Sequence, residues 1–156
     1  MKLDLKEIDK SIASFMERWG IIALRVSLGI IFIWFGILKT IGMSPAEPLV
    51  KATVGWLPFF STDGWVVVIG WWEFIIGVSF LFQKTIRIAI ALLAMQMVGT
   101  FMPLIVLTEI TFQAGHIPYA PTMEGQYIIK NLLIISAALV IGGTVRKPNY
   151  NSDRNY

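Results

Sequence analysis

Four long apolar stretches dominate this chain and place it in a membrane. They cover residues 21–43, 64–82, 86–112 and 127–145. About 20 consecutive apolar residues are needed to cross the ~30 Å hydrocarbon core of a bilayer as a helix. Because the stretches do not alternate polar with apolar residues, as a barrel strand would, each is expected to be a helix. The sequence therefore predicts an all-α membrane protein, with residues 1–156 forming one domain and four transmembrane helices forming an antiparallel bundle.

The few charged residues indicate how the bundle is oriented. Only 15% of the residues are charged, against about 25% in a soluble domain. Nine lysines and arginines fall in the N-terminal segment, the second connection and the tail, whereas only Lys51 falls in the other two connections. By the positive-inside rule, both termini are expected in the cytoplasm. No basic stripe is interleaved with exposed aromatic residues, which argues against nucleic acid as a partner.

The segments outside the apolar stretches also show helical patterns. In residues 1–20, apolar side chains recur at intervals of three and four residues, which predicts an amphipathic helix on the cytoplasmic membrane surface. These side chains are Leu5, Ile8, Ile12, Phe15 and Trp19. In the first connection, Ser44 and Glu47 match a capping box with Pro45 at the first helical position. We therefore expect a short helix over residues 44–57 at the outer face, either as a lid over the helix ends or as one wall of a site. Residues 146–156 form a polar tail.

The residue inventory excludes several kinds of chemistry. The chain has no cysteine and a single histidine, His116. Disulfide exchange, a thiolate nucleophile and iron–sulfur ligation all need cysteine, and zinc or bis-histidine haem sites need further ligands. We therefore expect no metal and no intrinsic cofactor, and no catalytic residue can be assigned.

Glu73 is the most unusual residue of the apolar stretches. It lies in the middle of the second stretch, where an unpaired carboxylate costs at least about 2.5–3.5 kcal/mol. The spacing of residues on each predicted helix places Glu73 on the face toward the neighbouring helices, and Lys39 on the corresponding face of the first helix. We therefore expect Lys39 to pair with Glu73, with Lys130 as the next candidate. The remaining polar candidates for a ligand site or an ion pair are Arg25, Gln96, Thr100, Asn131 and Glu109.

Glycines recur on the same predicted helix faces. Small residues at such positions allow two helix backbones to approach closely. The glycines expected to serve helix packing are Gly29, Gly36, Gly70, Gly77 and Gly99.

Two motifs resemble a known family. The segments "RVSLGIIFIWFGILK" and "GWWEFIIG", with the Ser-Pro segment between them, resemble the DoxX/DoxD superfamily of small four-helix membrane proteins, over about residues 20–145. By motif position Gly29, Gly36, Lys39, Gly70, Glu73 and Gly77 correspond to recurrent residues of that family. The resemblance implies a bundle in the prokaryotic cytoplasmic (inner) membrane. It also implies an association with redox chemistry, as in the membrane subunit of thiosulfate:quinone oxidoreductase.

Three functions are compatible with these observations. The first is a membrane subunit that binds a quinone or another lipid-like molecule and serves a redox partner. The second is a purely structural subunit of a larger membrane complex, in which the Glu73–Lys39 pair only holds helices together. The third is a small proton-coupled transporter acting as an oligomer. The expected partners are membrane lipids, together with other membrane subunits or further copies of the chain.

Overall fold

The computed structural model describes residues 5–145. Within that range the chain consists of helices and loops, apart from one isolated bridge between Phe112 and Pro121. The helices are α1 (Leu5–Thr40), α2 (Glu47–Val54), α3 (Thr62–Leu81), the 3-10 turn η1 (Gln83–Thr85), α4 (Ile86–Phe101), α5 (Pro103–Val106), α6 (Thr108–Thr111), α7 (Met123–Ile129) and α8 (Asn131–Thr144). The predicted tail, residues 146–156, lies outside the described residues, as do residues 1–4.

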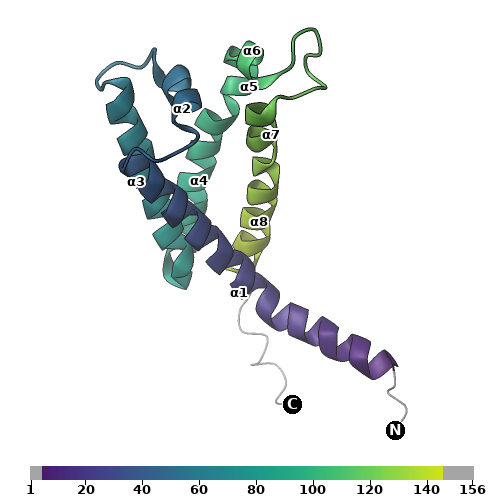
Figure 1. Cartoon of the computed structure of the whole chain (residues 1–156). Coiled ribbons are helices and arrows are strands. Elements are labelled where there is room, and N and C mark those ends of the chain that lie inside the picture. Colours follow the sequence, from purple (N-terminus) through teal and green to yellow (C-terminus); the bar gives the residue numbers. More distant parts are fainter. Residues whose placement is uncertain (1–4, 146–156) are drawn as a thin grey trace.

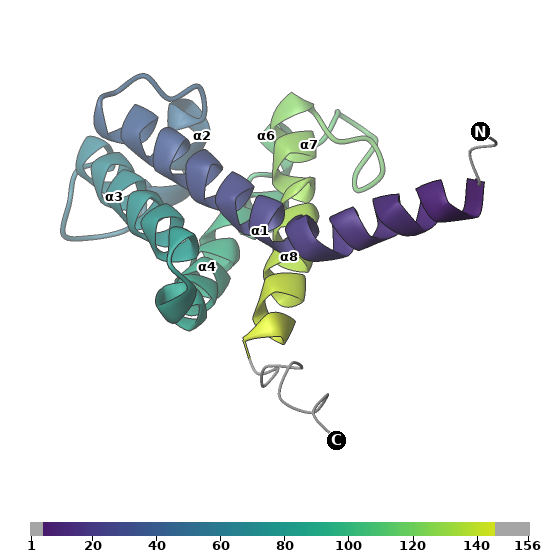
Figure 2. The ribbon, with the colours of Figure 1, turned by 90° about the horizontal axis from the view of Figure 1, so that it is seen from below.

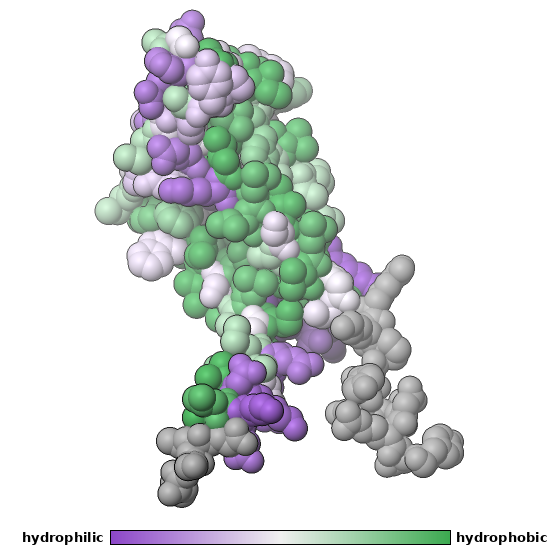
Figure 3. Space-filling model, turned by 90° about the vertical axis from the view of Figure 1, so that its right-hand side faces the viewer, coloured by the Kyte–Doolittle hydropathy of each residue, from purple (hydrophilic) through white to green (hydrophobic). Residues whose placement is uncertain are grey.

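Among residues 5–145, four helical stretches are long and apolar enough to cross a membrane. They are Leu5–Thr40, Thr62–Leu81, Gln83–Val106 and Met123–Thr144. They run in alternating directions, with α2, α5 and α6 gathered at one end (Figure 1). Hydrophobic residues cover the middle of the face in Figure 3, and hydrophilic residues gather mainly toward its two ends. The all-helical, multi-pass membrane character expected from the sequence is therefore confirmed.

The first span and the segment before it form one helix. We expected an amphipathic helix to end near Gly20, but α1 continues unbroken from Leu5 to Thr40. A single glycine lowers the stability of a helix without ending it. Residues 5–20 of α1, the N-terminal arm, are exposed along their whole length. The arm leaves the other helices at an angle to the rest of α1 (Figures 1 and 2).

The helix in the first connection forms, but the prediction that Ser44 and Glu47 form a capping box at its start is wrong. α2 begins at Glu47, with Ala46 at its N-cap and no side-chain cap. The chain leaves α1 through Gly42, whose φ is 68°, and the Glu47 amide then donates to the Ser44 carbonyl at 3.1 Å. Ser44 therefore lies two residues before the N-cap position and does not cap α2. The early proline is Pro48 rather than Pro45, since a proline is tolerated where the first helical turn needs no amide donor.

The last two predicted spans are interrupted. The third was expected as one helix over residues 86–112, but α4 ends at Phe101, and two short helices follow it. Pro103 cannot donate to the preceding turn, and the non-helical backbone of Leu107 (φ −126°, ψ 47°) separates α5 from α6. In the fourth span, a turn at Lys130 separates α7 from α8. Both interruptions lie toward the end of the structure that carries α2.

Glycines bring α1 and α3 into close contact. A Cβ placed on Gly36 would lie 2.6 Å from the Gly70 carbonyl oxygen, and one on Gly70 would lie 2.8 Å from that of Gly36. About two helical turns further along α3, a Cβ on Gly77 would lie 2.7 Å from the Gly29 carbonyl oxygen. These separations are too short for any side chain, so the two antiparallel backbones touch at both levels. This packing fixes the relative register of α1 and α3, and with it the separation of Lys39 from Glu73.

Candidate ligand cavity and buried ion pair

A cavity of about 690 Å³ lies among the helices at the end that carries α2. Its walls come from α1, α2, α3, α4, α7 and α8, so every span contributes. Most of the lining side chains are apolar, including Phe32, Trp72, Met97 and Ile134. The polar ones are Lys39, Thr53, Glu73, Gln96, Thr100, Lys130 and Asn131.

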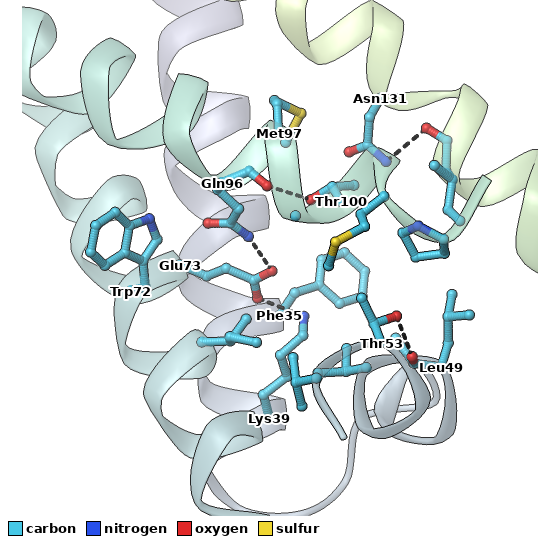
Figure 4. A pocket seen from close by; sticks show the side chains of 18 of the residues that line it. Phe35, Lys39, Leu49, Thr53, Trp72, Glu73, Gln96, Met97, Thr100 and Asn131 are labelled. Atoms are coloured by element: carbon cyan, nitrogen blue, oxygen red, sulfur yellow. Dashed lines mark hydrogen bonds and ion pairs between the residues drawn. The ribbon is translucent and has the colours of Figure 1, made fainter. Parts of the chain in front are cut away.

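A buried ion pair forms part of the cavity wall. Lys39 Nζ lies 2.6 Å from Glu73 Oε2, and the two side chains are 8% and 11% exposed. Gln96 Nε2 donates to the other carboxylate oxygen, Oε1, also at 2.6 Å. Figure 4 shows the three side chains converging from α1, α3 and α4. The expected contact between Glu73 and Lys39 is therefore present, and each oxygen of the carboxylate accepts a hydrogen bond.

Three other polar residues expected at a site also border the cavity. Thr100 Oγ1 donates to the Gln96 carbonyl at 3.1 Å, and Asn131 Nδ2 donates to the Tyr127 carbonyl at 3.0 Å. Lys130, the second candidate partner of Glu73, does not pair with it. Its Nζ lies 5.4 Å from the centre of the Tyr127 ring instead. The cavity thus has a paired lysine on α1 and a second lysine at the junction of α7 and α8.

Two of the expected polar residues lie elsewhere, and one glycine was misassigned. Arg25 is half-buried in α1 outside the cavity lining, and Glu109 is exposed in α6. Gly99 was expected to pack against another helix, but a Cβ placed there meets nothing within 4 Å. Gly99 borders the cavity instead. An apolar stretch looks the same whether its glycine faces a helix or an empty space, so spacing alone does not separate these cases.

The cavity also uses residues that were not singled out as site candidates. Trp72 lines it and holds α3 against α4, because its Nε1 donates to the Leu92 carbonyl at 3.2 Å. Leu49 and Thr53 of α2 face the cavity in Figure 4. The apolar spacing within residues 44–57 was the available signal for α2. Of the two roles considered for this segment, the structure places it in the cavity wall.

A surface ion-pair cluster ties α2 to the start of α3. Lys51 Nζ lies 2.5 Å from Asp63 Oδ1 and 2.7 Å from Glu47 Oε1. The hydrogen bond that Lys51 donates to Asp63, followed by the one that it donates to Glu47, raises the pKa of Lys51 to about 12. Ser61 caps α3 beside this cluster by accepting from the Gly64 amide at 3.1 Å. Together these contacts position α2 over the cavity.

Comparisons with known proteins give no independent assignment. No protein-family model, no curated protein and no solved structure matches this chain. The function is therefore argued from the cavity and from the residues that border it.

Proposed function

We propose that the protein is an integral membrane subunit that binds one apolar small molecule, a quinone or a lipid-like compound, in the cavity beside Glu73. In line with the sequence resemblance, we propose that this protein is a DoxX-like subunit and that it serves a redox partner. The observation that carries the proposal is the cavity itself. Ligand pockets commonly measure about 300–1,000 Å³ and combine apolar walls with a few placed polar groups, and this cavity, at about 690 Å³, has both features.

The proposed placement in the membrane follows from the charge distribution. We propose that α1, α3, α4 and the α7–α8 pair form an antiparallel bundle in the prokaryotic cytoplasmic membrane, with both termini in the cytoplasm. The cavity then lies in the outer half of the bilayer, beneath α2. The N-terminal arm lies at the cytoplasmic surface, where its apolar side chains contact lipid.

A second candidate function is supported by the burial of the ion pair. With side chains only 8% and 11% exposed, Lys39 and Glu73 suit a purely structural subunit in which the pair holds α1 to α3. The size of the cavity favours ligand binding over this alternative, because a half-open apolar cavity of about 690 Å³ has room for a small lipid-like molecule. Most of the cavity lining is apolar, whereas a proton-coupled transporter needs a continuous polar path. The lining therefore favours binding of an apolar ligand over proton-coupled transport.

Filling the cavity tests the proposal. Gly99→Leu adds a side chain into space that is open in the structure, and Gly143→Leu adds the same side chain at a glycine of α8 that also meets nothing within 4 Å but does not border the cavity. Binding of a tritiated decylquinone would be measured for both variants in lipid nanodiscs. We expect Gly143→Leu to bind as the unmodified protein does and Gly99→Leu to lose binding. Equal binding by the two variants would contradict a site in the cavity.

A further inference from the structure

The charges that border the cavity do not cancel. Lys39 is paired with Glu73 at 2.6 Å. Lys130 also borders the cavity, and within residues 5–145 no carboxylate lies within salt-bridge distance of its Nζ. The exposed acidic residues Glu109 and Glu124 are absent from the cavity lining. The lining therefore carries two ammonium groups and one carboxylate, and its net charge is positive.

The contact that Lys130 does make leaves its charge available. Its Nζ lies 5.4 Å from the centre of the Tyr127 ring, and that ring is itself 63% exposed. An exposed cation–π contact is weaker than a hydrogen bond between an ammonium group and an anion. A bound anion therefore gains more from Lys130 than the contact with Tyr127 provides.

Within residues 5–145, two buried polar atoms of the cavity wall lack a hydrogen-bond partner, one donor and one acceptor. The Nε1–H of Trp65 is buried without an acceptor in the described part of the chain. Gln96 Oε1 is the one buried acceptor of the lining that lacks a donor there. It lies on the side of the Gln96 amide toward Trp72 and away from Lys39 (Figure 4). The cavity thus offers the free N–H of Trp65 and the positive charge of Lys130, and both match a ligand head rich in acceptor oxygens.

We infer that the cavity takes a single-chain amphiphile with an anionic head, of the fatty-acid class, and that Lys130 binds the head. The chain lies against the apolar wall that Phe32, Met97 and Ile134 provide. The inference rests on the proposed function, since it names the ligand of the same cavity. An anionic phospholipid carries similar head chemistry, but its two chains and glycerol exceed the about 690 Å³ of the half-open cavity, so part of it would lie outside. The inference therefore commits to one chain.

Binding of a matched pair of ligands tests this inference. Dodecanoate and 1-dodecanol have the same chain and differ in the charge of the head. Both would be titrated at neutral pH into protein in phosphatidylcholine nanodiscs, for the unmodified chain and for Lys130→Met, Lys130→Arg and Lys84→Met. Lys84 lies in η1, outside the cavity, and serves as the control for loss of one lysine. Thermal unfolding of each variant would establish that it is folded.

The expected result is a preference for dodecanoate of about tenfold or more, the size of effect given by one charge-assisted hydrogen bond. Lys130→Met removes this preference, whereas Lys130→Arg and Lys84→Met keep it. Equal binding of both ligands, or an unchanged preference in Lys130→Met, would overturn the anionic head while leaving the proposed apolar site intact. Binding of neither ligand would overturn the proposed site as well. If a few mole per cent of dilauroyl phosphatidylglycerol displaced dodecanoate, the single-chain assignment would be wrong.

Discussion

The Lys39–Glu73 pair predicts large and strongly non-additive mutational effects. Glu73→Leu removes a carboxylate that accepts from Lys39 Nζ and Gln96 Nε2, each at 2.6 Å. It leaves an ammonium group on a lysine side chain that is only 8% exposed. Breaking a buried pair by removing one partner costs about 3–5 kcal/mol. Lys39→Met strands the carboxylate instead, and we expect a loss in the same range, reduced by the remaining hydrogen bond from Gln96.

The double variant should recover most of that loss. With Leu at position 73 and Met at position 39, no charge is left buried, and apolar replacements of a buried pair are often neutral. Additive effects would give a total loss of about 6–10 kcal/mol, whereas we expect about 0–2 kcal/mol beyond the loss of the Gln96 hydrogen bond. The coupling energy between Lys39 and Glu73 should therefore be at least about 3 kcal/mol.

The free energy of unfolding would be measured by titrating sodium dodecyl sulfate into mixed micelles and following helix content. The matched control combines Glu73→Leu with Lys84→Met, which should be additive because Lys84 lies outside the cavity and away from the pair. Additive losses for the Lys39 and Glu73 variants would refute the reasoning, since the two residues would then not stabilise each other in the membrane.

Three further predictions concern packing, orientation and the position of α2. Gly36→Ala places a methyl group 2.6 Å from a backbone oxygen of α3, so it should lower the free energy of unfolding by about 1–3 kcal/mol, whereas Gly143→Ala, which meets nothing within 4 Å, should not lower it. A cysteine at Ser61 should react with a membrane-impermeant maleimide from outside the cell, and one at Ser152 only after the membrane is opened; the reverse pattern would contradict cytoplasmic termini. Because the pKa of Lys51 is raised from 10.5 to about 12, its ion pairs should hold α2 fully below pH 10.5 and be lost as the pH rises through about 12. An NMR titration of the Lys51 side chain with its midpoint at 10.5 would show that the ion pairs do not form.

Much of the helix that carries Glu73 was predictable from the sequence. The spacing of α3 placed Gly70, Glu73 and Gly77 on one inward face, and all three are buried. A polar residue and two glycines mark that face clearly against the apolar residues around them. The same contrast on α1 located Lys39, so the partner of Glu73 could be named before the structure was known.

Other features could not be predicted, because the sequence lacks such contrast. On α4 the residues expected to face the other helices were Gln96 and Gly99, whereas the buried residues are Ile86, Ala89, Leu93 and Met97. A helix that is apolar on every side gives spacing rules little to distinguish its faces. The cavity was likewise not predictable, since it arises where the breaks at Pro103 and Lys130 and the position of α2 leave space between helices far apart in the sequence.

The central claim is that this cavity holds an apolar ligand, and native mass spectrometry of protein extracted from its own membrane tests it most directly. The account predicts one bound small molecule per chain in the unmodified protein and in Gly143→Leu, and none in Gly99→Leu, where the added side chain occupies open space beside the cavity wall. A ligand retained by Gly99→Leu at the same occupancy, or no ligand in the unmodified protein, would contradict the claim.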